Sequence, residues 1–130
     1  MELKIGRDTL LAISAVAWAD GSMDPREAEA LRQAAKQLNI QGEDLSQVER
    51  SLSTRVSLDE VETVHMNRLT RLFTYATSCW MAEVDGQRSA AETALLQLLG
   101  DRLGLSAVAR DRAYNAVRGI AERSVPGAFD

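Results

Sequence analysis

Two short acidic turns carry the side chains in this sequence that could bind a divalent cation. Asp20 is followed seven residues later by Glu27, and Asp85 stands at the same distance before Glu92. A glycine follows each aspartate, and the spacing from that glycine to the glutamate is that of the second half of an EF-hand calcium loop. The pattern therefore predicts a weak, oxygen-ligated site for Ca²⁺ or a similar cation at these four residues, with Asp24 as an additional ligand.

The first half of the EF-hand pattern does not occur in either turn. Its opening ligand positions fall on Val16 and Trp18 in the first turn and on Met81 and Glu83 in the second, so at most one carboxylate is supplied there. EF-hands need oxygen ligands at those positions. The two turns are consequently not EF-hands, and an ion would depend on Asp and Glu side chains shared within or between them.

A second interpretation of the same residues is structural. Asp24 and Ser89 are typical N-cap residues, and Glu27 and Glu92 follow each of them by three positions, as in a capping box. The glycines after Asp20 and Asp85 suit the end of a helix. The two aspartates are less easily explained, because a negative charge at the C-terminal end of a helix opposes its dipole. Both interpretations stay open.

The turns belong to an internal repeat. Residues 12–40 and 77–105 align without gaps and share six identical residues, offset by 65 positions. The identities are Ala17, Asp20, Gly21, Glu27, Leu31 and Leu38, which return as Ala82, Asp85, Gly86, Glu92, Leu96 and Leu103. Such self-similarity indicates a duplicated structural unit. We predict two helical hairpins, over about 9–40 and 68–105.

Helical spacing of apolar residues recurs along the chain, and no segment alternates as a half-buried strand would. The predicted fold is therefore all-α, a single domain over 1–130 with about six or seven helices and a flexible tail from about 124. We expect helices over 8–19, 25–38, 43–52, 57–84, 90–103 and 107–122, with a bend near 65–67. The long fourth helix has apolar positions that include Val64, Leu69 and Phe73.

Composition excludes several classes of function. The net charge of −4 argues against a nucleic-acid partner, and no uncharged run is long enough for a membrane span. The N-terminus lacks the features of a secretory signal, which favours the cytoplasm. His65 has no second histidine or cysteine near it, and Cys79 lies in an apolar stretch. Neither a nucleophile elbow nor a phosphate-binding loop occurs, so we predict that the protein is not an enzyme.

The repeated turn sequences, with their Leu-Asn-Ile and Leu-Gly-Leu endings at 38–40 and 103–105, resemble those of the TerB-like family. Founding members of that family are associated with bacterial tellurite resistance and general stress. The resemblance implies a compact bundle of six or seven helices built around two hairpins. It also implies that Asp20, Glu27, Asp85 and Glu92 are candidate metal ligands.

Two functions follow as expectations. The first is a non-enzymatic interaction or adaptor domain in a bacterial stress response, which binds an unidentified protein through the acidic turn surface. Trp18, beside the first turn, is the candidate partner contact, because exposed tryptophans often anchor interfaces. The second is a divalent-cation-responsive domain, with Ca²⁺ the cation that the turns suggest. The sequence does not distinguish a monomer from a homodimer.

Overall fold

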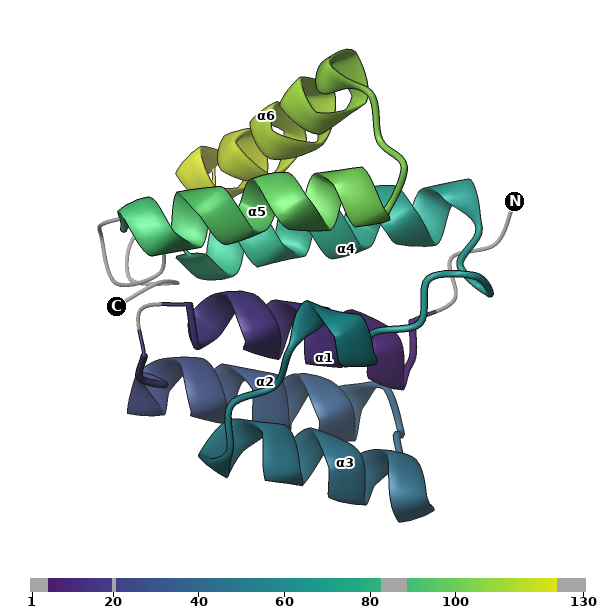
Figure 1. The fold of residues 1–130 in the computed structure, drawn as a ribbon, viewed down its shortest axis with the longest axis vertical. Coiled ribbons are helices and arrows are strands. Elements are labelled where there is room, and N and C mark those ends of the chain that lie inside the picture. Colours follow the sequence, from purple (N-terminus) through teal and green to yellow (C-terminus); the bar gives the residue numbers. More distant parts are fainter. Residues whose placement is uncertain (1–4, 20, 83–88, 124–130) are drawn as a thin grey trace.

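The computed structural model describes residues 5–19, 21–82 and 89–123, and within these ranges the chain is all-helical, as predicted. Its elements are α1 (Arg7–Ala17), α2 (Pro25–Gln37), α3 (Gly42–Ser53), the 3-10 helix η1 (Leu58–Glu60), α4 (Arg68–Ala82), α5 (Ala90–Arg102) and α6 (Ala107–Arg123). In Figure 1, α1 and α4 lie next to each other in the middle of the bundle, with α2 and α3 on one side and α5 and α6 on the other. No helix in the described ranges combines the length and apolar character that a membrane crossing requires.

The internal repeat extends over three helices rather than two. Helices α2 and α5 begin at Pro25 and Ala90, and α3 and α6 begin at Gly42 and Ala107. Both pairs of starting residues are 65 positions apart, the offset of the sequence repeat. The third helix of each unit has no clear sequence identity with its counterpart, which is why the repeat is shorter in the sequence. The fold therefore consists of two three-helix units, α1–α3 and α4–α6.

The two units meet through equivalent residues. Thr9 on α1 and Thr74 on α4 are 65 positions apart, both are buried, and their hydroxyl oxygens lie 2.9 Å from each other in a hydrogen bond. Contact between a residue and its own counterpart is the arrangement found on the axis of an isologous dimer. The two units are thus packed with pseudo-two-fold symmetry, within one chain.

Corresponding helix ends in the two units also have the same geometry. The amide of Ile40 donates to the Ala35 carbonyl at 3.0 Å, and the amide of Leu105 donates to the Gly100 carbonyl at 3.0 Å. The residue before each donor is left-handed, with φ of 59° at Asn39 and 69° at the corresponding glycine. These are Schellman-type helix ends.

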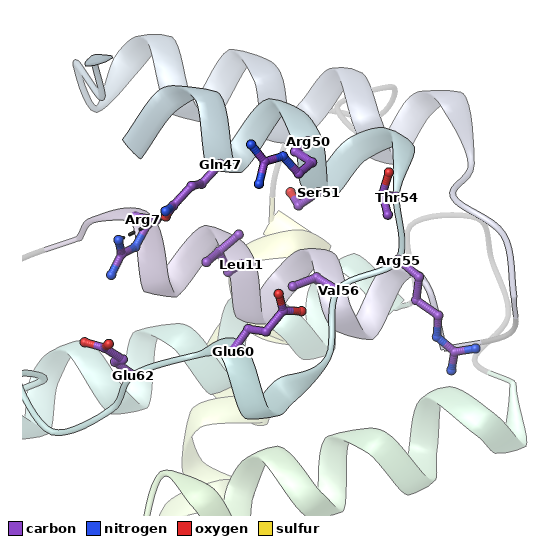
Figure 2. Close-up of a pocket in the computed structure, with 10 residues that line it drawn as sticks. All are labelled: Arg7, Leu11, Gln47, Arg50, Ser51, Thr54, Arg55, Val56, Glu60 and Glu62. Atoms are coloured by element: carbon purple, nitrogen blue, oxygen red, sulfur yellow. Dashed lines mark hydrogen bonds between the residues drawn. The ribbon is translucent and has the colours of Figure 1, made fainter. Parts of the chain in front are cut away.

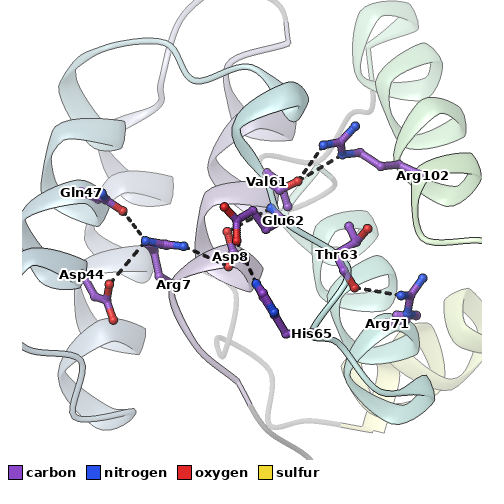
Figure 3. Close-up of polar contacts among 10 residues, drawn as sticks. All are labelled: Arg7, Asp8, Asp44, Gln47, Val61, Glu62, Thr63, His65, Arg71 and Arg102. Carbon is purple, nitrogen blue, oxygen red and sulfur yellow. Dashed lines mark hydrogen bonds and ion pairs between the residues drawn. The ribbon is translucent and has the colours of Figure 1, made fainter.

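The prediction of one helix over 57–84 is wrong. Its capping box is present, but Ser57 caps only η1, and seven residues separate the end of η1 from the start of α4 at Arg68. The intervening carbonyls accept hydrogen bonds from distant side chains instead of from a helix (Figure 3). Arg102 Nη2 donates to the Val61 oxygen at 2.8 Å, and Arg71 Nη2 donates to the Thr63 oxygen at 2.8 Å. Val61 is also completely buried, so the segment is held in a non-helical conformation, with a turn closed by the bond from the Met66 amide to the Thr63 carbonyl at 3.0 Å.

Candidate functional site

The two repeated glutamates lie at the beginnings of α2 and α5. Each is 5% exposed. Glu27 Oε1 accepts a hydrogen bond from the Asp24 amide at 3.3 Å, and Glu92 Oε1 accepts one from the Ser89 amide at 2.9 Å. Both carboxylates therefore complete capping boxes, as the structural interpretation of the turns predicted.

The cation site remains a prediction. Asp20 and Asp85, its other two expected ligands, lie outside the described residues. Within the described part of the chain, no group of three or more His, Cys, Asp or Glu side chains is placed to hold a metal ion. The beginnings of α2 and α5 lie at the same end of the bundle, but in outer layers separated by α1 and α4 (Figure 1).

Asp24, the additional ligand candidate, is engaged in helix capping. Its Oδ1 accepts a hydrogen bond from the Arg26 amide at 2.7 Å, and the Arg26 guanidinium lies 3.4 Å from the same oxygen. These bonds favour the ionised form, so the pKa of the Asp24 carboxyl lies below its ordinary value. Ser89 caps the second unit at the equivalent position with a hydroxyl, which does not titrate.

This difference predicts a pH-dependent cap in the first unit only. Because its pKa is lowered by folding, the Asp24 carboxylate adds stability above the unfolded pKa of about 3.9 and loses it as the pH falls through the folded pKa. Chemical unfolding of wild type and Asp24→Ser should therefore show wild type losing stability relative to the variant between about pH 5 and pH 3. A stability difference that stays constant over this range would contradict the assignment.

Trp18, the predicted partner contact, packs between helices. Its Nε1 donates a hydrogen bond to the Ser51 carbonyl on α3 at 2.7 Å, and the side chain is half-buried. The Ser14 hydroxyl donates to the same carbonyl at 2.9 Å. Trp18 therefore joins the end of α1 to α3, and a contact with a partner would use only the remaining exposed part of the ring.

A polar cavity of about 280 Å³ lies between α1, α3 and the segment 54–62. Figure 2 shows Arg7 at one end, the Glu60 carboxylate rising from η1, and Leu11 on the floor. Arg7 Nη1 donates to Gln47 Oε1 at 3.0 Å and lies 3.6 Å from Asp44 Oδ1. The Arg7 guanidinium thereby connects α1 to α3 across the end of this cavity.

A second cluster of polar contacts lies beside that cavity and stabilises the non-helical segment that follows η1 (Figure 3). Asp8 Oδ1 accepts from the Glu62 amide at 3.1 Å, and Glu62 Oε2 lies 2.8 Å from His65 Nε2. The contact with His65 lowers the pKa of the Glu62 carboxyl. These bonds attach the segment to α1, so we assign the cluster a structural role.

An apolar groove lies between α4 and α6. Its volume is about 470 Å³. Leu69 and Phe73 of α4 and Val108 of α6 line it, with exposed fractions of 39%, 37% and 60%. We call this feature the α4–α6 groove. A smaller apolar cavity of about 330 Å³ between α2 and α4 is also lined by Phe73, so the apolar surface continues past α4.

Sequence reasoning missed this groove. It assigned Val64, Leu69 and Phe73 to the apolar face of the long helix, whereas the structure leaves all three exposed, Val64 to 84%. A signal was present in the sequence, because apolar residues occupy more than one face of α4 and the helix contains no acidic residue. Such a helix has more apolar surface than one neighbour can cover.

A model of the family described as "Protein of unknown function (DUF533)" matches residues 5–117, which include α1 to α5 and the first part of α6. The DUF533 domain is helical and related to TerB-like proteins. No curated protein and no solved structure gives a significant match to the chain. The family match covers most of the chain, and the chain therefore belongs to the DUF533 family.

Proposed function

We propose that this member of the DUF533 family is a non-enzymatic interaction module that acts as an adaptor in a bacterial stress response. The observation that carries the proposal is the α4–α6 groove, where Leu69, Phe73 and Val108 expose large apolar side chains side by side. Contiguous apolar surface on a folded domain commonly marks a protein interaction site. The stress-response context is taken from the resemblance of the turn sequences to the TerB-like family.

The groove is a better candidate for the principal contact surface than the acidic turns. Glu27 and Glu92 are buried and bound to the amides of their own helix starts, so they present little free charge to a partner. The groove, in contrast, offers apolar area, whose removal from water drives association. Trp18 remains a secondary candidate beside the first turn.

Site-specific photo-crosslinking in the host bacterium tests the proposal. A photoreactive phenylalanine analogue placed at Leu69 should give one discrete adduct with another protein, because this side chain lines the groove. The matched control is Leu98 on α5, which is 57% exposed outside the groove. We expect the adduct from Leu69 and none of the same mass from Leu98.

Two other results would change the proposed contact surface or the proposed function. An adduct obtained from Trp18 but not from Leu69 would place the contact surface at the acidic turns. If neither position gave an adduct, and millimolar Ca²⁺ raised the melting temperature of the purified chain, the divalent-cation function would replace the adaptor function. The variant carrying both Asp20→Asn and Asp85→Asn should then abolish the Ca²⁺ effect.

A further inference from the structure

We propose that the α4–α6 groove is the docking site for an acidic amphipathic helix of a second protein. This inference rests on the proposed adaptor function and specifies the chemistry of its partner. It follows from comparing the groove with its counterpart in the first unit, and from the charges at the groove's edges.

The groove and the polar cavity of the first unit occupy equivalent places. Arg7 and Ser51 line the cavity between α1 and α3, and the residues 65 positions later, Leu72 and Ala116, line the groove between α4 and α6. The same relation holds for Leu11 and Ala76 and for Gln47 and Arg112. Duplication has therefore produced two versions of one surface feature.

The two versions differ in how they are filled. In the first unit, the Arg7 guanidinium bonds to Gln47 and so joins the two helices at one end of the cavity. In the second unit the counterpart of Arg7 is Leu72, which cannot form such a bond. The described residues of the second unit leave Leu69 and Val108 exposed on the two walls. An apolar surface of this kind is stabilised when another apolar surface covers it.

The charges beside the groove favour an acidic partner. Arg68 on α4 and Arg112 on α6 line it, and neither forms an ion pair with another residue in the described ranges. No Asp or Glu is among the described residues that line the groove. The chain as a whole carries a net charge of −4, so this local excess of positive charge stands out. Complementary charge at the rim of an interface gives specificity and raises the association rate.

A second copy of this chain is a poor occupant. Two copies joined by a two-fold axis through the groove would bring together the same surface twice. The interface would then hold Arg68 and Arg112 from each copy and no carboxylate from the groove walls. Like charges placed near each other oppose association. A different chain with Asp or Glu beside its apolar residues avoids that repulsion.

The shape of the groove suits a helix. Ala109, Ala113 and Ala116 form the α6 wall at helical spacing. Ala109 and Ala113 are only 7% and 8% exposed, so most of the contact surface for a third helix comes from the larger exposed side chains of Leu69 and Phe73 on α4 and Val108 on α6. Amphipathic helices dock in apolar grooves through side chains at positions i, i+3 or i+4, and i+7.

Selection from a displayed peptide library tests both parts of the inference without a known partner. The library consists of helices of about four turns with an apolar stripe of that spacing, the other positions being varied among Glu, Lys, Gln and Ser. The intact chain should enrich peptides rich in Glu. Enriched peptides should bind Val108→Asp at least about tenfold more weakly than wild type, whereas the matched surface variant Leu98→Asp should bind them normally.

Charge reversal provides the second readout. The variant with Arg68→Glu and Arg112→Glu should select Lys-rich peptides from the same library. Enrichment that depends on Val108 but shows no preference for charge would overturn the acidic partner and leave the adaptor function intact. Enrichment that is equal for wild type and Val108→Asp, or absent, would overturn the docking of a helix in this groove. The crosslinks from Leu69 and Trp18 then decide separately whether the protein is an adaptor.

Discussion

Replacing Arg71 by alanine is expected to lower the free energy of unfolding by about 2–4 kcal/mol. The Arg71 guanidinium donates three hydrogen bonds to backbone carbonyls, at 3.0 Å to Met66, 2.9 Å to Leu103 and 2.8 Å to Thr63. Two of these acceptors lie in the non-helical segment before α4, and the third lies at the end of α5. The substitution removes all three donors at once. The Thr63 carbonyl keeps its bond from the Met66 amide at 3.0 Å, but the partly buried carbonyls of Met66 and Leu103 lose the bond from Arg71, which costs more than losing a surface ion pair.

Urea unfolding monitored by tryptophan fluorescence measures this effect. The control is Arg68→Ala, which lies one turn earlier on the same helix, is exposed, and forms no ion pair with a described residue. We expect it to change stability by less than about 0.5 kcal/mol. Arg71→Lys should recover only part of the loss, because an ammonium group lacks the planar fork that reaches three carbonyls. Equal effects of the two alanine substitutions would refute the structural role of Arg71.

Replacing either Thr9 or Thr74 by valine is expected to lower the free energy of unfolding by about 1–3 kcal/mol. The double variant should lose much less stability than the sum of the two single losses. Valine has nearly the same shape as threonine, so each single substitution mainly deletes one hydroxyl. It leaves the other hydroxyl buried without the bond of 2.9 Å that now joins the two units. Removing both hydroxyls removes the unsatisfied group.

A double-mutant cycle measures this coupling by thermal or chemical unfolding. Thr77→Val on α4 is the control, since its hydroxyl donates to the Phe73 carbonyl of its own helix, at the surface, and to no other described residue. Its stability change should simply add to that of Thr9→Val. If the effects of Thr9→Val and Thr74→Val also added without coupling, the hydroxyls would not act as a pair at the pseudo-two-fold axis.

Local interactions made much of this fold predictable from the sequence. The N-cap at Asp24 and the capping box at Ser89 depend on residues within three positions, so the sequence predicts both, and the structure contains both. The all-helical class follows in the same way from the spacing of apolar residues along each helix. The repeat can be recognised in the sequence because the turn and helix-start residues recur in both units.

The candidate site could not be predicted in this way. Leu69 and Phe73 have the residue types of a core face, and only the positions of α2, α4 and α6 show that no described element covers them. The break between η1 and α4 also depends on Arg71 and Arg102, which bond to carbonyls 8 and 41 positions away. Local sequence patterns do not predict which distant side chain will donate a hydrogen bond to a given carbonyl.

The sequence by itself thus determined where the locally capped helices begin and that the chain contains a duplication. It also determined that carboxylates cap the starts of α2 and α5. The tertiary structure decided how the units meet, at Thr9 and Thr74, and which apolar residues remain uncovered. The physical reason is the sequence separation over which each kind of interaction acts. Caps and helical periodicity act between residues a few positions apart, whereas burial and long-range hydrogen bonds depend on how whole helices pack.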